Sequence, residues 1–213
     1  MNQVIRVVYF FEDVAHERFV RALVHRVAEE YHVPIEDDVR NATQGSRVRV
    51  ELRRFIREIG SRSHKPCPEM LVVVIDGNCR GVSQVRREIL AEIERSGATI
   101  AHLVFAIPNP HIERWYLEDQ QAWAQVLPGA KAKKIKYKCE RDRYKNELKK
   151  AIRAAGVEPL LGGAEYGEEI AKALSPQQLD RSFQDFWRDL KREFGLLANE
   201  TRTMKHGAQS EAR

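Results

Sequence analysis

Three acidic residues follow apolar segments that have the composition of buried β-strands. Glu12 follows VVYFF, Asp76 follows MLVVVI, and Glu113 lies just beyond LVFAI, in the first turn of an expected helix. Carboxylates that gather at one point repel one another unless a cation is present. Magnesium typically binds one or two carboxylates together with water and substrate phosphate. These residues therefore point to a magnesium site, where a bound ion could assist an in-line phosphoryl displacement.

Each of these acidic residues also has an ordinary structural explanation. Acidic residues at strand-to-helix junctions commonly cap helices, because the helix N-terminus favours negative charge. Asp76, followed by Gly77 and Asn78, could equally belong to a simple turn. His16, in the first turn of an expected helix, could be a metal ligand, a proton shuttle or a hydrogen-bonded structural histidine. The residues by themselves leave these alternatives open.

Strands and helices alternate along the first part of the chain. Continuous β-branched segments predict strands, and apolar residues spaced three or four apart predict helices. The expected strands are 4–11, a short one within 35–47, 70–75 and 99–107. The expected helices are 15–31, one through 52–59 that stops at Gly60, one through 85–93 that ends at Gly97, and 111–126. This alternation predicts an α/β fold with a mostly parallel sheet flanked by helices, whose site lies beyond the carboxyl ends of the strands.

The chain is expected to have three parts: an α/β domain (1–127), a basic helical extension packed on it (128–196), and a disordered polar tail (197–213). Trp115 and Trp123, two turns apart, are expected to face the core. An apolar stripe in the extension is expected to pack on the domain, or to dock a partner where it is exposed. The stripe consists of Phe183, Phe186, Trp187, Leu190 and Phe194.

The composition is that of a globular chain. Of 213 residues, 43% are hydrophobic and 31% are charged, with 12 Gly and 8 Pro, which excludes collagen-like and disordered classes. The mean hydropathy is -0.52 and no apolar run approaches about 18 residues, so the sequence predicts no membrane span. The first residues fit a β-strand better than a signal peptide.

Cysteine usage predicts a reducing environment. Cys67, Cys79 and Cys139 are an odd number and form no CxxC pair, so we expect no disulfide framework and a cytoplasmic location. His64 lies near Cys67, but no second close pair accompanies them, and a zinc site has little support.

The net charge is +5, and basic residues are densest in 131–153, which contains eleven Lys or Arg residues against three acids. This stretch could be a phosphate-binding face for nucleic acid, or only a solvated helix with internal ion pairs. Arg80 could add to the same face. The expected nucleic-acid-binding residues are Arg80, Lys133, Lys134, Lys136, Lys138, Arg141 and Arg143.

Five segments, taken in order, resemble a known bacterial family. EDVAHERFV (12–20) resembles the glutamate segment that opens TOPRIM-like domains, and IDGNCRG (75–81) resembles their strand-end DxD motif. Three further segments resemble one TOPRIM-like family, known as domain of unknown function 4276, which is related to OLD-type TOPRIM nucleases of phage-defence systems. These segments are FAIPNPHIERWYLED (105–119), DRYKNELKKAI (142–152) and YGEEIAKALSPQQLDRSFQDFWRDL (166–190).

The resemblance implies roles for individual residues. Glu12 matches the TOPRIM glutamate, a general acid or base, and Asp76 matches the first DxD aspartate, a metal ligand. Glu113 and Asp119 match two acidic residues of the family's third segment. Lys145 matches a family lysine that could contact phosphate.

The chain departs from the TOPRIM pattern at three positions. Asp13 replaces a glycine, and His16 replaces an acidic residue, although Glu17 follows at once. Asn78 replaces the second DxD aspartate, which keeps a carbonyl ligand but removes one negative charge.

The resemblance thus implies a Mg²⁺- or Mn²⁺-dependent TOPRIM endonuclease that cuts DNA or RNA and works with an ABC-type or AAA ATPase in antiviral defence. An exposed part of the apolar stripe could also join two copies of the chain in a homo-oligomer. Two alternatives stay open. One is a non-catalytic nucleic-acid-binding or regulatory subunit on the same fold. The other is an enzyme that transfers or hydrolyses phosphate on small molecules.

Overall fold

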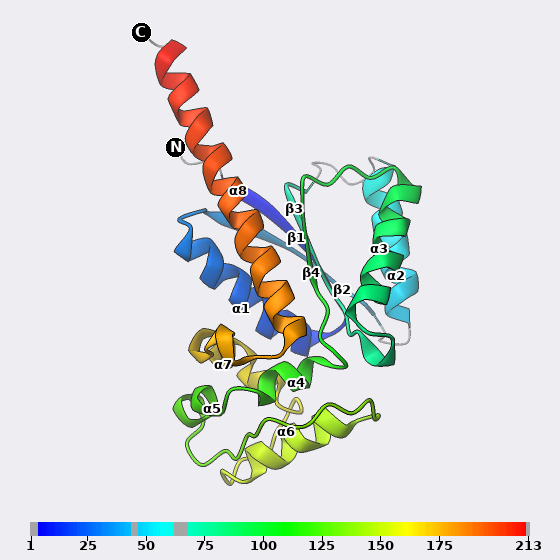
Figure 1. The fold of residues 1–213 in the computed structure, drawn as a ribbon, viewed down its shortest axis with the longest axis vertical. Helices are drawn as coiled ribbons and strands as arrows, with labels where there is room; N and C mark the ends of the chain where they lie inside the picture. Colours follow the sequence, from blue (N-terminus) through cyan, green and yellow to red (C-terminus); the bar gives the residue numbers. More distant parts are fainter. Residues whose placement is uncertain (1–3, 44–46, 62–67, 212–213) are drawn as a thin grey trace.

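The computed structural model describes residues 4–43, 47–61 and 68–211, with side chains as far as residue 203. Its centre is a four-stranded parallel sheet in the order β2-β1-β3-β4 (Figure 1). The strands are β1 (Ile5–Phe11), β2 (Ile35–Asn41), β3 (Met70–Val74) and β4 (His102–Ala106). Every residue of β3 is buried, as its continuous apolar sequence requires of a strand covered on both faces. The predicted α/β fold with a mostly parallel sheet is confirmed at this level.

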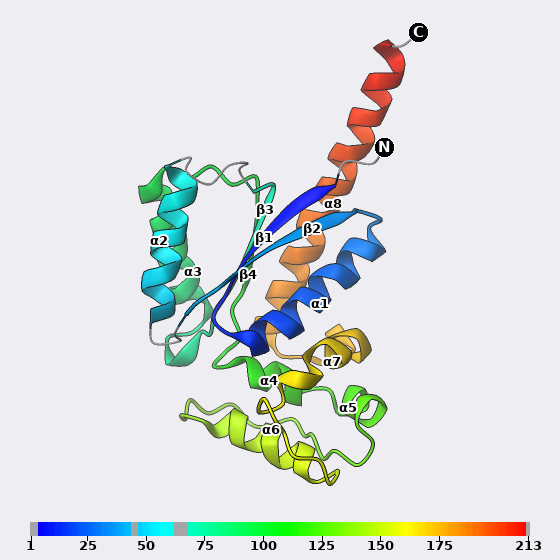
Figure 2. The same ribbon diagram turned by 180° about the vertical axis from the view of Figure 1, so that it is seen from behind.

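Helices cover both faces of the sheet. The helices α2 (Val48–Gly60) and α3 (Val82–Ser96) lie side by side on one face, while α1 (Val14–Glu30) and α8 (Arg181–Glu211) lie on the other (Figures 1 and 2). Each face has its own apolar cluster, because alternate strand residues point to opposite sides. In β1, for example, Tyr9 packs with the α1 side.

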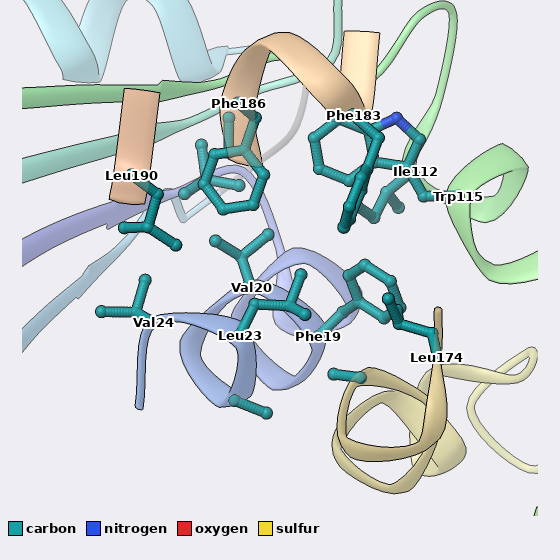
Figure 3. Packing of buried hydrophobic residues seen from close by; sticks show 14 of the residues in the cluster. Phe19, Val20, Leu23, Val24, Ile112, Trp115, Leu174, Phe183, Phe186 and Leu190 are labelled. Atoms are coloured by element: carbon teal, nitrogen blue, oxygen red, sulfur yellow. The ribbon is translucent and has the colours of Figure 1, made fainter. Parts of the chain in front are cut away.

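The core on the α1 side is rich in aromatic rings. Figure 3 shows Phe19 and Leu23 of α1 facing side chains of α8 and of α4 (Ile112–Leu117). Trp115 of α4 stacks on Phe186 and meets Phe183 edge-on, with ring centroids 5.5 and 5.1 Å apart. Trp115 and Trp123 are both fully buried, and four of the five stripe residues are buried, with Trp187 partly exposed. These predictions of core positions are confirmed.

The prediction of one helix over 111–126 is wrong, since two short helices replace it. These are α4 and α5 (Gln120–Val126), and Asp119 stands between them. The carboxylate of Asp119 accepts hydrogen bonds from the backbone N–H groups of Gln121 and Ala122, and therefore starts a new helix. It also accepts the N–H of Ser175, which fixes the break against a distant loop.

The extension is less helical than its sequence predicts. Its regular helices are α6 (Arg143–Arg153), α7 (Gly167–Ala173) and α8, with 3-10 turns at Ala164–Tyr166 and Pro176–Gln178. Residues 130–140 form no regular helix, and the chain enters them through Pro128-Gly129, where Gly129 has φ +95°. Two hydrogen bonds tie this segment to α6: the backbone N–H of Lys131 donates to the carbonyl of Ala151, and the backbone N–H of Lys138 donates to the Tyr144 hydroxyl.

The helix α8 continues to Glu211, through a segment for which the sequence predicts a disordered tail. Leu197 and Ala198 are buried in the same apolar cluster as β1 and α1, so the first turn past residue 196 is held by packing. That cluster contains residues from both expected domains. The boundary near residue 127 stays a prediction. Within the described ranges, none of the helices combines the length and the apolar character that spanning a membrane requires.

We expect Ser182→Ala to lower the free energy of unfolding by about 1–3 kcal/mol, because it removes a buried bridge between α8 and α4. The Ser182 hydroxyl accepts the indole N–H of Trp115 (2.9 Å) and the backbone N–H of Asn109 (3.3 Å). Without it the Trp115 donor is left buried and unpaired. Denaturant unfolding checks this against Ser83→Ala, an exposed position on α3. Equal stabilities of the two variants would contradict the expectation.

Candidate metal centre

The topology brings two distant acidic residues together. From β1 the chain crosses to β2 on one side, and from β3 it crosses to β4 on the other side, so the order reverses between β1 and β3. Ligand sites of parallel sheets lie beyond the carboxyl ends of strands at such a reversal. Phe11 is in register with Val74, so that Glu12 and Asp76 emerge at the same edge.

Glu12, His16 and Asp76 offer ligand atoms that all lie within 4.8 Å of one another. The Glu12 carboxylate accepts the backbone N–H of Asp76 (2.8 Å), and His16 Nε2 lies 2.9 Å from Asp76 Oδ1. His16 and Asp76 are buried, whereas Glu12 is partly exposed. The predicted convergence of Glu12 and Asp76 is therefore present, and His16 belongs to the same cluster.

Asp76 is also connected to the start of α4. Its Oδ2 lies 2.9 Å from His111 Nδ1, and its Oδ1 accepts the backbone N–H of Ile112 at 2.9 Å. The structural alternative considered for this residue is thus partly correct, because Asp76 satisfies a helix N-terminus. The helix is α4, which follows β4, and this contact holds the Asp76 carboxylate in the centre of the cluster.

The orientation of His16 is set by its neighbour Asp13. The Asp13 carboxylate caps α1 by accepting the backbone N–H groups of Ala15 and His16, and it also lies 2.7 Å from His16 Nδ1. This contact assigns a proton to Nδ1 and leaves Nε2 facing Asp76. Metal-binding histidines are commonly oriented by a carboxylate in this way.

The cluster shifts the proton affinities of its members. Burial lowers the pKa of His16, but the Asp76 charge and the hydrogen bonds to Asp13 and Asp76 outweigh it and hold this pKa well above the usual value. Burial opposes ionisation of Asp76, but His16 and His111 hold its pKa below the usual value. Burial and the Asp76 charge raise the pKa of Glu12 and of Glu113. Opposed shifts in one small site are typical of functional clusters.

A cavity of about 420 Å³ opens over this cluster. Carboxylates from the sheet edge form part of its lining. The extension contributes Arg141 and Lys145 together with Glu140 and Asp142, and Asp142 lies 3.5 Å from the Arg141 guanidinium. Of the residues predicted from the sequence, the cavity is lined by Glu12, Asp76, Asn78, Glu113, Arg141 and Lys145. Asn78 has a left-handed backbone with φ 49°, which asparagine tolerates better than most residues.

Two further candidates lie elsewhere. Glu17 accepts a hydrogen bond from Asn41 (2.7 Å) and lines a different cavity along α1. Asp119 is buried as the cap of α5 and does not line the cavity over the cluster. Neither stands among the residues around Glu12 and Asp76, because one faces β2 and the other faces the loop before α8.

The predicted basic residues are dispersed. Lys138 and Arg143 pair with Glu140, Lys133 lies 3.9 Å from Glu147, and Lys134 donates to the carbonyl of Gln178. Lys136 is exposed. Arg80 pairs with Glu88 and lines a groove between α2 and α3.

The expectation of no disulfide is wrong for Cys79 and Cys139. The structure joins them, with their Cα atoms 5.6 Å apart, although they are separated by 60 positions in the sequence. Spacing could not reveal this pair, because only the fold brings the turn after β3 against the segment before α6. The bond fixes that segment, with Arg141, at the mouth of the cavity. His64 and Cys67 lie outside the described residues.

Sequence reasoning missed Asp13 and His111 as members of the site. From the sequence, Asp13 was noted only because it replaces a glycine of the family, and His111 only because the expected helix begins there. A signal was present for both, because Asp13 directly follows Glu12 and His111 lies two positions before Glu113. Both side chains can also form a hydrogen bond or an ion pair with a charged neighbour.

The donor set fits a divalent ion. Two carboxylates, with Glu113 and the Asn78 carbonyl beside them, suit Mg²⁺ or Mn²⁺, and an imidazole nitrogen favours Mn²⁺ or a later transition metal over Mg²⁺. The metal-free contacts between His16 and Asp76 join the same atoms that would bind the ion. A proton on His16 and a metal ion therefore compete for this position.

We expect the affinity for Mn²⁺ to increase as the pH rises from about 5 to 8, because binding must displace protons. Because the pKa values of His16, Glu12 and Glu113 are raised, these groups of the metal-free site stay protonated to a higher pH than usual. Calorimetric titration in two buffers of different protonation enthalpy measures both the affinity and the protons released. An affinity independent of pH, with no proton release, would contradict this competition.

Comparisons of the chain with protein-family models, curated proteins and solved structures return no significant match. The family resemblance and the roles that it implies therefore stay predictions.

Proposed function

We propose that this chain is a divalent-metal-dependent nuclease of TOPRIM-like type that hydrolyses phosphodiester bonds in DNA or RNA. One observation supports it above the others. Carboxylates that approach one another at a sheet switch point share one cavity with Lys145 and Arg141. A carboxylate cavity alone would repel a phosphodiester, whereas a bound cation and two cationic side chains would attract it.

The side chains of the site would have different roles in the reaction. Asp76 and Glu12, with His16, Asn78 and Glu113 around them, would hold the ion, and the ion would supply Lewis-acid stabilisation of charge on the phosphoryl group. Lys145 and Arg141 would hold non-bridging phosphate oxygens. Where Asp76 and its other neighbours hold the ion, Glu12 would accept the proton of the attacking water.

A second function is favoured by a specific observation. Asp76 already has four polar contacts without a metal, to His16, to His111, to Ile112 and through its own N–H to Glu12. A site whose charges are balanced in this way, and which has Asn78 in place of an acid, could serve a subunit that binds nucleic acid without cutting it. The proposed ATPase partner rests on the resemblance, and a homo-oligomer rests on the apolar stripe. The cytoplasmic location was argued from the expected lack of a disulfide, and the Cys79–Cys139 bond removes that support.

The test is a cleavage assay with plasmid, single-stranded DNA and tRNA, each with Mg²⁺, Mn²⁺ or EDTA. We expect cutting with Mn²⁺ or Mg²⁺, none with EDTA, and a loss of about 100-fold or more in Glu12→Gln. Glu17→Gln, in the first turn of α1 and outside the cavity, is the matched control and should cut as wild type does.

Other outcomes select the alternatives. Salt-sensitive binding of the same substrates without cutting supports the non-catalytic subunit. Release of phosphate from nucleotides, with polymers intact, supports a small-molecule enzyme. Because an ATPase partner could be required, the assay is repeated with the products of neighbouring genes present.

A further inference from the structure

A groove of about 450 Å³ lies between α2 and α3, the two helices that pack side by side on one face of the sheet (Figures 1 and 2). Its charged lining is five arginines against two glutamates. Apolar residues, among them Leu52, Ile56 and Ile89, line the groove between these charges. The arginines are Arg49, Arg53, Arg80, Arg87 and Arg95, and the glutamates are Glu88 and Glu92. We call this set the arginine groove.

One end of the arginine groove lies at the edge of the sheet that carries the metal centre. Parallel strands joined by crossover helices require those helices to run back from the carboxyl edge, so α2 and α3 both begin there. Arg49 is in the first turn of α2, and Arg80 lies four residues after Asp76, in the turn Asn78–Arg80. Arg95 is in the last turn of α3, about 20 Å further on by helix rise.

The two glutamates do not neutralise this groove. Glu88 pairs with Arg49 at 2.7 Å and also with Arg80, while Glu92 pairs with Arg95 at 3.0 Å and with Arg57 at 3.1 Å. Each glutamate is thus already ion-paired with two arginines.

Arg53 and Arg87 carry the unneutralised charge. Both side chains are exposed, and neither forms an ion pair with a carboxylate of the part of the chain that the structure describes. In addition, Arg49 Nη2 is buried, and no described residue accepts a hydrogen bond from it. The groove therefore offers charge and at least one donor to an anion from outside.

We propose that the arginine groove holds the backbone of a nucleic-acid strand that continues from the metal centre. This inference rests on the proposed function, and it names the surface that its substrate would follow. Guanidinium groups bind phosphate oxygens bidentately, and apolar side chains between them suit the sugars and base faces.

The test measures binding without cutting, in EDTA, by fluorescence anisotropy of labelled 15-nucleotide DNA and RNA of the same sequence. The variant is Arg53→Gln with Arg87→Gln, and the matched control is Arg188→Gln with Arg202→Gln, two exposed arginines of α8. We expect the groove variant to bind about 10-fold more weakly, and its log–log salt slope to be smaller by about 1.4, for two lost phosphate contacts on a single strand.

The control should bind as wild type does, and Arg53→Lys with Arg87→Lys should retain most of the affinity because the charge is kept. Thermal unfolding confirms that every variant is folded. Equal loss in the groove variant and the control would overturn the proposal. Competition by a polyglutamate peptide of equal charge, as strong as by the oligonucleotide, would also overturn it. The stronger of the DNA and RNA signals identifies the substrate.

Failure of this proposal and failure of the nuclease proposal give different results. If the protein cuts with metal and the groove variant binds normally, the groove is not the path. If it never cuts but the groove variant loses binding, the surface stands and the chain is a non-catalytic nucleic-acid-binding subunit.

Discussion

Asp76→Asn is expected to weaken Mn²⁺ binding and metal-dependent cutting by about 100-fold or more. Asp76 occupies the centre of the cluster, where its carboxylate lies 2.9 Å from both His16 Nε2 and His111 Nδ1. Asparagine has nearly the same size and can still accept the N–H of Ile112. The substitution therefore removes the charge that attracts a cation and leaves the shape of the site in place.

Two measurements separate this expectation from a simple loss of folding. Calorimetry with Mn²⁺ reports the affinity directly, even if cutting requires a partner, and thermal unfolding in EDTA reports the stability. Asp185→Asn, a partly exposed aspartate on α8, is the matched control and should leave both binding and cutting unchanged. If Asp76→Asn binds Mn²⁺ as tightly as the control does, the metal centre is wrongly assigned.

The same variant has a second expected effect, on its histidine neighbours. The Asp76 carboxylate raises the pKa of His16 and of His111. In the wild type, the ion pairs of these histidines with Asp76 stabilise the metal-free fold. This stabilisation is complete below the histidine pKa of the unfolded chain, about 6.5, and is lost as the pH rises through the histidine pKa values of the folded protein. In Asp76→Asn this loss should become smaller. It is measured as a flatter dependence of unfolding free energy on pH, in EDTA, between about pH 6 and 9.

Cys139→Ser is expected to lower the free energy of unfolding by about 2–4 kcal/mol. The Cys79–Cys139 bond closes a loop across 60 positions, and closing a loop of this size restricts the unfolded chain strongly. Reduction of the wild type by a dithiol should have the same effect, because it transfers two electrons and two protons to the bond and leaves two free thiols. Denaturant unfolding with and without dithiothreitol measures both.

Cys67→Ser, which removes a thiol but not this bond, is the control and should keep the stabilising effect of oxidation. Cys79→Ser should match Cys139→Ser within error. Alkylation of all three cysteines in the unreduced, unfolded protein would contradict the expectation, since it would show that the bond does not form. The variants also free the segment that carries Arg141, so a weaker affinity for nucleic acid should accompany the loss of stability.

Much of the α/β architecture was readable in the sequence because local patterns encode it. Continuous apolar residues in Met70–Val74 predict a strand buried on both faces, and the helical spacing of Phe19, Leu23 and Val27 predicts the face of α1 that is buried. Acidic residues directly after two such strands predict a shared edge, because parallel strands end together. For Glu12 and Asp76 the sequence therefore predicted a shared edge, whereas their contact also depends on β1 and β3 being neighbours in the sheet.

Only the tertiary structure decided what surrounds those two carboxylates. Two of these features depend on the exact turn of a helix: Asp13 orients His16, and Glu17 faces away from the cluster. Two others depend on contacts between segments far apart in the chain: His111 and the start of α4 hold Asp76, and Cys79 is bonded to Cys139. Spacing along a sequence fixes the phase of a helix or a strand. It does not fix the distance between two loops, because loop closure depends on the packing of the whole sheet and its helices.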